Sequence, residues 1–375
     1  MRVLVVNAGS SSLKLSLLDA QDTVVHGADL PAGPDGIDTS GLAGLLRGWG
    51  LCDSGRPDAV GHRIVHGGTV FTGPVLITDA VTKQLRELTD LAPLHQPKSL
   101  AALDAVTACL PGVAAVASFD TAFHTTIPPA AATYAVPREW RQRYAIRRYG
   151  YHGLSHAYCS WRAAQLAGRP LAELRIIPCH LGAGASLAAV LNGRSVDTTM
   201  GFTPLEGLVM ATRSGTVDPG LVLWLEEHEH LSPHEVATAL EQRSGLTALA
   251  GTGDMREVEA AADRGDQDAR LAIDVYTHRL AGGIAAMSAA TGGVDLLAFT
   301  GGVGEHSALI RQRAAQRLAY LGVAIDPLAN DTGREDSDIT APGATVRTLV
   351  ITAREDLQIA GEARRLLDVP DPTSG

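Results

Sequence analysis

The stretch Val3-Leu-Val-Val-Asn-Ala-Gly-Ser-Ser-Ser-Leu-Lys-Leu-Ser-Leu-Leu18 decides the fold. Its apolar beginning predicts a strand, residues 7–12 predict a tight polar turn, and the second apolar run predicts a returning strand. The small residues of the turn allow backbone N–H groups to approach a phosphate, and Lys14 follows within reach as a cation. A plain hairpin with a polar turn fits the same residues, so the pattern alone leaves both interpretations open.

Two later segments repeat this arrangement of an apolar run and a glycine-rich turn. Residues 176–178 lead into His180-Leu-Gly-Ala-Gly-Ala-Ser186, which is followed by a second apolar run and the turn signal Asn192-Gly193. Leu296–Thr300 leads into Gly301-Gly302-Val303-Gly304, after which Glu305 opens a helical stretch toward Tyr320. The recurrence suggests a duplicated fold with two similar domains.

Helical patterns lie between these strands, and strands alternating with helices predict the α/β class. The expected helices cover residues 82–91, 99–109, 155–166, 233–241 and 266–289. Pro128-Pro129 and residues 330–345 are expected to be connectors. A P-loop is excluded because no Gly-Lys pair occurs in the sequence.

The composition excludes several classes of function. A chain of 375 residues is long enough for two domains, and a formal charge of −10 argues against nucleic acid or an anionic membrane as a partner. The longest apolar stretch, residues 280–294, is broken by glycines and is expected to form a buried helix and a turn rather than a membrane span. The four cysteines lack paired spacing, which favours a reduced cytoplasmic protein.

Two arginines stand in segments typical of anion binding. Arg63 lies between an apolar run and a Gly-Gly turn in Gly61-His-Arg-Ile-Val-His-Gly-Gly68, and Arg213 lies in Ala211-Thr-Arg-Ser-Gly-Thr-Val-Asp-Pro-Gly220. A guanidinium group can hold a carboxylate or a phosphate through its planar fork of N–H donors. Two arginines suit phosphoryl transfer to an anion, because both reactants are negative and charge spreads over the equatorial oxygens.

The histidines offer a zinc site as a competing interpretation. Tyr151-His-Gly-Leu-Ser-His156 places two imidazoles four residues apart, but Gly153 replaces the glutamate of a zinc-protease helix. A zinc hydrolase built on His152 and His156 is therefore disfavoured, and His152 is expected to donate a hydrogen bond to a transferring phosphoryl group. Ordinary core positions are expected for His62, His66 and His156.

Carboxylates follow two predicted strands. Asp120 comes directly after the apolar run 113–117 in Ser118-Phe-Asp-Thr-Ala-Phe-His124, a usual place for a catalytic or metal-linked acid. Val350-Ile-Thr-Ala-Arg-Glu-Asp356 has the same form. Because Mg²⁺ needs only one or two carboxylates besides phosphate oxygens and water, Glu355 or Asp356 would suffice.

Taken together, these segments resemble the acetate kinase family, within the larger superfamily of sugar kinases, Hsp70 and actin. The resemblance runs in order from Asn7 to Ala360. The motifs that carry it are Asn7–Lys14, Gly61–Gly68, Ala92–Pro97, Phe119–His124, Arg148–His156, His180–Ser186, Thr203–Pro219 and Phe299–Glu305. It implies two ribonuclease H-like domains facing each other across a cleft, with an N-terminal domain over residues 1–121 rejoined by a C-terminal helix in residues 357–375. A central nucleotide-binding domain would cover residues 122–356.

The resemblance also implies a role for each matching residue. Arg63 and Arg213 would hold the carboxylate and the moving phosphoryl group, and His152 with Arg213 would stabilise the transition state. Asp120, Glu355 and Asn7 would lie at a site for Mg²⁺ or Mn²⁺ and the phosphates. The pocket for the acetate methyl group would be formed by Val65, Leu94, Tyr151 and Pro204, with His95 in the same cleft.

Residues 182–186 would cradle the phosphates of ATP, and residues 301–304 would pack against adenosine. The full set that the resemblance assigns to ATP is Lys14, His180, Leu181, Gly182, Ala183, Gly184, Asp254, Met255, Arg256, Gly301, Gly302, Val303, Gly304 and Glu305. The implied reaction is reversible, direct in-line transfer of the γ-phosphoryl group of ATP to acetate by a homodimer, without a phospho-enzyme.

Four positions depart from the family's pattern. Gln96 replaces an Asn, His306 replaces an Asn, Ala183 replaces an Asn of the phosphate turn, and Tyr151 replaces a more frequent Phe. The lost amide at Ala183 is expected to cost about 1 kcal/mol or less of ATP binding. Tyr151 adds a hydroxyl group beside the expected acid pocket.

Alternatives remain within and outside this family. A propionate-preferring kinase differs by one methylene in the pocket, which is worth only about 1–3 kcal/mol. A kinase that uses pyrophosphate is disfavoured because Gly302-Val303 leaves room for adenosine, and a butyrate-type enzyme is disfavoured by the segment 63–68. A non-enzymatic nucleotide-binding regulator would be expected to lack Arg63, His152 or Arg213.

Overall fold

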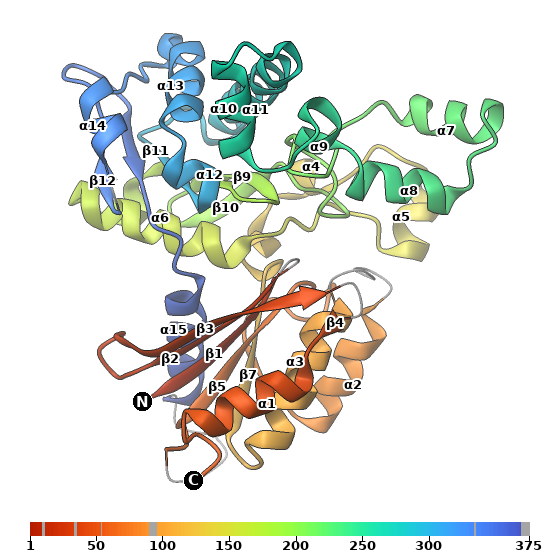
Figure 1. Ribbon diagram of the computed structural model, residues 1–375, viewed down its shortest axis with the longest axis vertical. Coiled ribbons are helices and arrows are strands. Elements are labelled where there is room, and N and C mark those ends of the chain that lie inside the picture. The colour runs from red at the N-terminus through yellow and green to blue at the C-terminus, as the bar shows by residue number, and fades with distance from the viewer. Residues whose placement is uncertain (10–11, 34–35, 54, 90–95, 334, 369–375) are drawn as a thin grey trace. The chain divides into compact units, whose positions relative to one another are not determined.

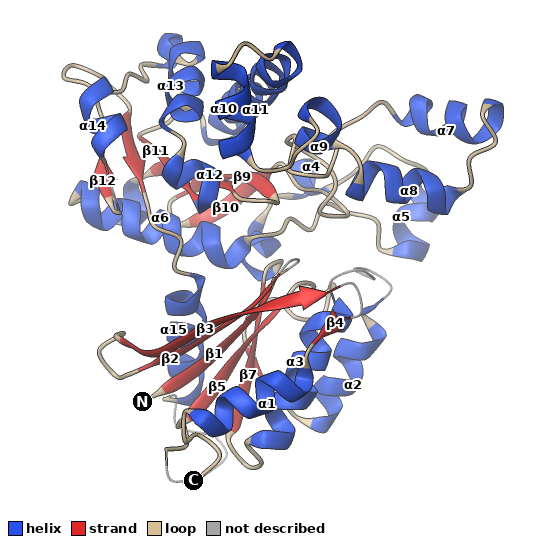
Figure 2. Ribbon diagram, viewed as in Figure 1, coloured by secondary structure: helices blue, strands red, loops and turns tan. Residues whose placement is uncertain are grey.

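The computed structural model describes residues 1–9, 12–33, 36–53, 55–89, 96–333 and 335–368. The chain divides into two compact units, drawn in Figure 1 and coloured by secondary structure in Figure 2. The first unit comprises Met1–Thr125, Gly153–Tyr158 and Arg354–Gly375, and the second comprises Thr126–His152 and Cys159–Ala353. Each unit is built around one mixed sheet flanked by helices.

Within the described residues, the sheet of the first unit has seven strands in the order β4-β3-β2-β1-β5-β7-β6. Strands β1, β5 and β7 run parallel, whereas β2, β3 and β6 are antiparallel to their neighbours. The strands are β1 Val3–Ala8, β2 Ser12–Leu18, β3 Val24–Gly33, β4 Gly36–Ile37, β5 Ala59–Ile64, β6 Val75–Leu76 and β7 Ala114–Phe119. The helices are α1 Thr39–Gly48, α2 Asp79–Glu87, α3 Gln96–Cys109 and α15 Glu355–Leu367.

The described part of the second unit has a six-stranded sheet in the order β10-β9-β8-β11-β13-β12. Its strands are β8 Arg175–Leu181, β9 Ala185–Leu191, β10 Arg194–Thr198, β11 Leu296–Thr300, β12 Ser337–Asp338 and β13 Arg347–Val350. Strands β8, β11 and β13 run parallel, β8–β9–β10 form an antiparallel meander, and β12 is antiparallel at the far edge. The first unit has the same arrangement in β1, β5, β7, in β1–β2–β3 and in β6, which confirms the predicted duplication.

Along the sequence, the helices of the second unit lie before β8, between β10 and β11, and between β11 and β12. They are α4 Pro129–Ala132, α5 Arg138–Tyr144, α7 Pro219–His228, α8 Pro233–Gln242, α9 Gly245–Ala250, α10 Met255–Asp263, α11 Gln267–Thr291, α12 Gly301–His306, α13 Ala308–Arg317 and α14 Pro327–Thr332. Helix α6, Gly153–Ala167, begins in the first unit and continues in the second. The predicted buried helix and turn at residues 280–294 are confirmed, because α11 ends at Thr291 and Gly292 caps it at φ 68°. No described helix is long and apolar enough to cross a membrane.

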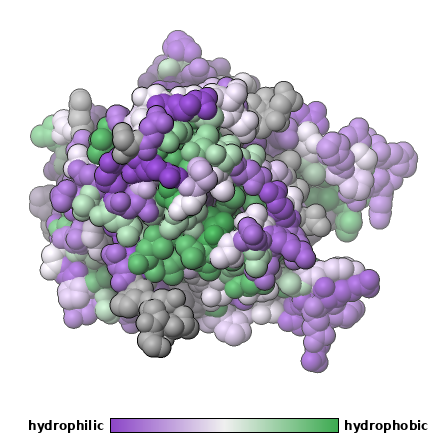
Figure 3. Space-filling model, turned by 90° about the horizontal axis from the view of Figure 1, so that it is seen from below, coloured by the Kyte–Doolittle hydropathy of each residue, from purple (hydrophilic) through white to green (hydrophobic). Residues whose placement is uncertain are grey.

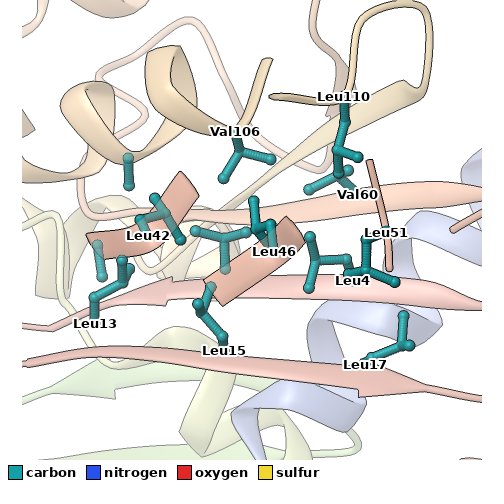
Figure 4. Packing of buried hydrophobic residues seen from close by; sticks show 13 residues of the cluster. Leu4, Leu13, Leu15, Leu17, Leu42, Leu46, Leu51, Val60, Val106 and Leu110 are labelled. Atoms are coloured by element: carbon teal, nitrogen blue, oxygen red, sulfur yellow. The ribbon is translucent and has the colours of Figure 1, made fainter. Parts of the chain in front are cut away.

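Strand β1 is apolar along its length because both faces of its sheet are covered. Alternate residues of a strand point to opposite faces, so Leu4 and Val6 pack under α1 and α3 while Val3 and Val5 pack against α15. Figure 4 shows the leucines of α1 inserted over those of the first strands. Outside the core, the face seen in Figure 3 carries a group of hydrophobic residues at its centre with hydrophilic residues around it. Apolar surface of this kind is ordinary and assigns no partner by itself.

Helix α15 approaches the sheet closely at Gly61 of β5. A Cβ atom at this position would lie 2.5 Å from Cγ2 of Ile359. Ile359 is fully buried, together with Ala360 and Ala363 of the same helix. The C-terminal helix is therefore part of the core that the N-terminal strand begins.

Candidate active site

Arg63 and Asp120 meet because their strands are parallel neighbours. Arg63 is the next-to-last residue of β5, and Asp120 follows the last residue of β7, whose Phe119 pairs with Ile64. The guanidinium group of Arg63 donates from Nε to Oδ1 of Asp120 at 3.0 Å and from Nη2 to Oδ2 at 2.6 Å. This bidentate ion pair is mostly buried, with side-chain exposures of 12% and 2%.

Asn7, near the end of β1, joins this pair to the C-terminal helix. Arg63 donates from Nη1 to the side-chain oxygen of Asn7 at 3.2 Å and to the Ala8 carbonyl at 3.0 Å. The amide nitrogen of Asn7 donates to Oε2 of Glu355 at 2.7 Å. Segments at both ends of the chain thus meet at one cluster, Asn7–Arg63–Asp120–Glu355, as the resemblance implies.

The charges of this cluster favour a further cation. Burial raises the pKa of Asp120, and the charge of Arg63 opposes that effect. Burial also disfavours the charged form of Arg63, but Asp120 and Glu355 together hold its pKa above the ordinary value. One guanidinium group beside two carboxyl groups leaves one negative charge when both are ionised, which suits Mg²⁺. Among the described residues, no three His, Cys, Asp or Glu side chains form a metal site of their own.

Two buried histidines lie on β5 and in the turn after it: His62 within the strand and His66 two residues beyond its end. Burial lowers the pKa of each to about 4, so both are neutral at pH 7, in agreement with the predicted core positions. Gln96 is buried here: its side-chain oxygen accepts from the His66 amide and its nitrogen donates to the carbonyls of His66 and Leu85, each at 3.3 Å. Val65 is buried nearby in the chain, whereas Leu94 and His95 lie outside the described residues.

In the second unit, the side chains of His152 and Arg213 both lie close to Gly184. A Cβ atom at Gly184 would be 3.1 Å from Nη1 of Arg213 and 3.3 Å from Nε2 of His152. The other ring nitrogen of His152, Nδ1, is 2.9 Å from Oγ of Ser186, and the ring lies against that of His180 at 4.4 Å between centroids. Glycine in the turn between β8 and β9 therefore leaves the space in which both side chains approach.

His152 has a left-handed backbone, with φ 56°, directly before α6 begins. Such a conformation is uncommon for a residue with a side chain and concentrates at functional sites. The left-handed backbone of His152 therefore supports a functional role for this residue besides packing.

Arg213 is held by the loop before it. Its Nη1 donates to the carbonyl of Pro204 at 3.2 Å and lies 3.6 Å from the sulfur of Met210. Burial lowers the pKa of Arg213, an effect that the charge of Glu241 opposes. A cation in this setting gains from an anion placed beside it.

Tyr151, which the resemblance assigns to the acid pocket, is buried in the second unit. Its hydroxyl group donates to the carbonyl of Phe202 at 2.8 Å. The extra hydroxyl therefore ties two backbone segments of the second unit together, in addition to any effect on the acid.

Of the glycine-rich segments assigned to ATP, residues 182–184 form a tight turn, whereas Gly301–Gly304 already belong to helix α12, which begins before the expected start at Glu305. The amide of Gly182 donates to the carbonyl of Gly184 at 3.0 Å, and the Ala183 carbonyl accepts from the amide of Ala211. Gly301 has φ 79° beside the backbone of Leu181, and a Cβ atom at Gly302 would meet nothing within 4 Å. Both segments lie at the ends of the adjacent parallel strands β8 and β11.

Several residues of the predicted ATP set have structural contacts. The carboxylate of Glu305 accepts from the amides of Gly301 and Ala353, at 2.9 and 3.0 Å. Asp254 caps α10 and pairs with the exposed Arg256, while Met255 is buried. Lys14 is exposed on β2, in register with Asp29 of β3.

Sequence reasoning missed Tyr134 and the contacts of Glu206. Glu206 lies within a quoted motif, but nothing in the sequence links it to Tyr134, whose hydroxyl group donates to its carboxylate. Arg148 donates to the same carboxylate at 2.9 Å. Only the folded chain brings these residues together.

Comparison with known proteins identifies relatives along the whole chain. Residues 53–361 match the Acetokinase family. Acetate kinase of Clavibacter sepedonicus is 44% identical over 96% of this chain and 98% of its own length, and that of Microcystis aeruginosa is 41% identical over 98% and 100%. Among solved structures, acetate kinase of Porphyromonas gingivalis is 36% identical with a TM-score of 0.88, over 98% of this chain and 99% of that one. A propionate kinase of Francisella tularensis is 35% identical with a TM-score of 0.89, over 97% and 99%.

Proposed function

Since the chain belongs to the acetokinase family, we propose that it transfers the γ-phosphoryl group of ATP reversibly to acetate, which yields acetyl phosphate and ADP. The observation that carries this proposal is that His152 and Arg213 both approach Gly184, in the glycine-rich turn between β8 and β9. Two N–H donors at one turn are suited to the charge that develops on a phosphoryl group in flight.

In this mechanism Arg213 holds the moving phosphoryl group and His152 donates to one of its equatorial oxygens. The contact between Nδ1 of His152 and Ser186 fixes the ring, so that Nε2 is on the side of Gly184. Arg63, whose guanidinium group is oriented by Asp120 and Asn7, holds the acid. Transfer is direct and in line, because the chemistry requires positioning and charge stabilisation rather than a covalent enzyme intermediate.

The cluster Asn7–Arg63–Asp120–Glu355 fits a divalent cation by its excess of carboxylate charge. Asp120, Glu355 and Asn7 would hold Mg²⁺ or Mn²⁺ together with phosphate oxygens. Bound there, the ion neutralises charge on the phosphate oxygens of ATP. The protein's own part is to keep two carboxylates together, which Arg63 and Asn7 do through their hydrogen bonds.

Acetate is the proposed acid and ATP the proposed donor. Pro204 and Tyr151 in the second unit, with Val65 and Leu94 of the first, are the residues proposed for the methyl pocket. Room beside Gly302 supports an adenosine-containing donor over pyrophosphate. The four cysteines without paired spacing support a cytoplasmic location, and the family resemblance supports a homodimer, which sedimentation of the purified chain tests.

The experiment that tests the proposal is acyl-phosphate formation from MgATP, trapped with hydroxylamine, with formate, acetate, propionate and butyrate in parallel. A strong acetate signal is the expected result, and a stronger propionate signal would move the assignment to that acid. Absence of product with every acid would contradict the proposal, after which pyrophosphate is the donor to test.

A further inference from the structure

One peptide segment of the second unit is held by hydroxyl groups on both sides. The amide of Phe202 donates to the phenolic oxygen of Tyr134 at 3.0 Å, and the carbonyl of Phe202 accepts from the hydroxyl of Tyr151 at 2.8 Å. Both tyrosines reach this segment from other parts of the chain. Phe202 is thus fixed from two directions by groups that a Phe in place of either Tyr would lack.

Tyr134 is itself held by charged neighbours. Its hydroxyl group donates to Oε2 of Glu206, while Oε1 of Glu206 accepts from Nη2 of Arg148 at 2.9 Å. Arg148 also donates from Nη1 to the carbonyls of Thr199 and Met200, at 3.3 and 3.1 Å. A polar network whose members all have partners resists displacement more than separate bonds do.

Each of residues 199–202 therefore has a backbone group in a hydrogen bond with another part of the chain. Thr199 and Met200 are held by Arg148, the Gly201 carbonyl accepts from the amide of Tyr149, and Phe202 is held by the two tyrosines. A Cβ atom at Gly201 would collide with the carboxylate of Glu206 and the hydroxyl of Tyr134. The network therefore leaves no room for a side chain at position 201.

This segment leads directly to Pro204. Pro204 is proposed above as a wall of the acid pocket, and its carbonyl accepts from the guanidinium group of Arg213. A displacement of Phe202 would therefore reach two functional positions, the wall that meets the acid and the arginine that meets the phosphoryl group.

We propose that Tyr134 and Tyr151 are positioning residues that hold Phe202, fix the Pro204 wall, and so set the preference for acetate over larger acids. The inference rests on the proposed function. A pocket distinguishes acids that differ by one methylene only if its wall does not yield to the larger one. The hydroxyl at position 151, where the family resemblance leads one to expect Phe, gives this chain a second bond to the wall.

The test uses Tyr134→Phe, Tyr151→Phe and the double variant, with Tyr149→Phe as the matched control. The Tyr149 ring lies 6.1 Å from that of Phe202, but its hydroxyl group donates to the carbonyl of Ala145 instead of to residues 199–204. The control thus removes one hydroxyl group beside the Phe202 ring and leaves the hydrogen bonds of Tyr134 and Tyr151 to Phe202 in place.

The decisive measurement is the ratio of kcat/KM for acetate to kcat/KM for propionate. We expect this ratio to fall about threefold in each single variant and about tenfold in the double variant, with Tyr149→Phe unchanged. A purely structural role would lower both values in the same proportion, because it reduces the amount of active enzyme and leaves the ratio constant.

The outcomes separate the two levels of inference. A constant ratio in Tyr151→Phe and in the double variant overturns the positioning role while leaving the kinase activity established. Absence of acyl phosphate from either acid in the unaltered chain overturns both the activity and the inference. Should Tyr134→Phe fail to fold, as judged by its melting curve, Tyr151→Phe alone decides the question.

Discussion

The two arginines proposed to bind the reactants have contrasting surroundings. Arg63 is paired with a buried carboxylate, and its pKa is held high by Asp120 and Glu355 against the effect of burial. Arg213 contacts the Pro204 carbonyl and the sulfur of Met210, and burial lowers its pKa. The same substitution at the two positions should therefore have different effects on stability.

Arg63→Ala is expected to lower kcat by about 100-fold or more and to destabilise the first unit by about 3 kcal/mol. The stability loss arises because Asp120 is left as a buried charge without its partner. Chemical unfolding and steady-state kinetics measure the two effects. The double variant Arg63→Ala/Asp120→Asn should regain stability without regaining turnover, and full turnover in either variant would contradict the role of Arg63.

Arg213→Ala is expected to lower kcat by about 100-fold or more with a smaller change in stability, because the substitution also removes a buried charge. The measurement is kcat at saturating acetate and MgATP, together with the melting temperature. Arg313→Ala is the control, since Arg313 forms only a partly exposed ion pair with Asp274 and should keep its activity. Unchanged turnover in Arg213→Ala would exclude it from the reaction.

At the scale of elements, local patterns predicted several of the longer helices and the carboxylates that follow the strands of the site. Predicted helix 99–109 lies within α3, and predicted helix 233–241 lies within α8. Asp120 was placed correctly after a strand because an apolar run ends before it. The predicted connector at 330–345 was wrong in part: it contains the end of α14 and strand β12, whose Ser337 pairs with the distant Val350. Pairing across the sheet leaves no local signal, and neither does the bond between Tyr134 and Glu206.

The turn between β8 and β9 gives the sharpest test at this scale. Gly184→Ala is expected to lower kcat about 10- to 100-fold. The added methyl group would lie 3.1 Å from Nη1 of Arg213 and 3.3 Å from Nε2 of His152, so it displaces one or both side chains. Turnover of the purified variant, with its melting curve, measures this. Gly282→Ala is the control: a Cβ atom there meets nothing within 4 Å, and alanine favours helix α11 by about 1 kcal/mol. Equal activity in the two variants would contradict the placement.

Strand β5 makes the first unit sensitive to acid through His62. Neither ring nitrogen has a hydrogen-bond partner among the described residues, and burial lowers the pKa from 6.5 to about 4. Between these two pKa values the imidazole of His62 is protonated in the unfolded chain and neutral in the folded chain. The contribution of His62 to the free energy of unfolding is full above pH 6.5, falls as the pH drops toward 4, and changes no further below that value.

The full loss from His62 amounts to about 3 kcal/mol. His62→Met, which fills similar volume without a titratable group, should reduce the dependence of unfolding free energy on pH between 6.5 and 4, and His66, whose pKa burial also lowers to about 4, accounts for part of the slope that remains. Denaturant unfolding at several pH values measures the slope. A slope unchanged from that of the unaltered chain would show that His62 is not the group responsible.

At the scale of the whole molecule, two sheets of like topology account for the repeated hairpins in the sequence. The order β3-β2-β1-β5-β7-β6 in the first unit corresponds to β10-β9-β8-β11-β13-β12 in the second. The domain boundaries predicted at residues 121 and 356 remain a prediction. What a local pattern could not supply is the assignment of Gly153–Tyr158 to the first unit, which depends on contacts such as that of the Gly153 amide with the Asp120 carbonyl.

The folding stability of the first unit depends on α15. Ile359→Asp is expected to abolish acyl-phosphate formation by unfolding the first unit, because it buries an unpaired charge beside β5. Limited proteolysis should then cleave residues 1–125 while residues 159–353 resist. The exposed Arg365 on the same helix serves as the control, and Arg365→Gln should behave as the unaltered chain. A protease-resistant first unit in Ile359→Asp would contradict this dependence.

The position of α15 in the first unit has a consequence for how the protein is made. On the ribosome strands β1 to β7 emerge before residues 159–353, and α15, the helix that covers one face of their sheet, emerges after those residues. Residues 159–353 are complete before it appears, so the second unit can fold while the nascent first unit still exposes Val3 and Val5. Glu355 also arrives with that helix, and the cluster with Asn7 and Arg63 closes only then. A chain that stops before residue 355 thus lacks Glu355 and cannot complete this cluster, and we expect no acyl-phosphate formation from it.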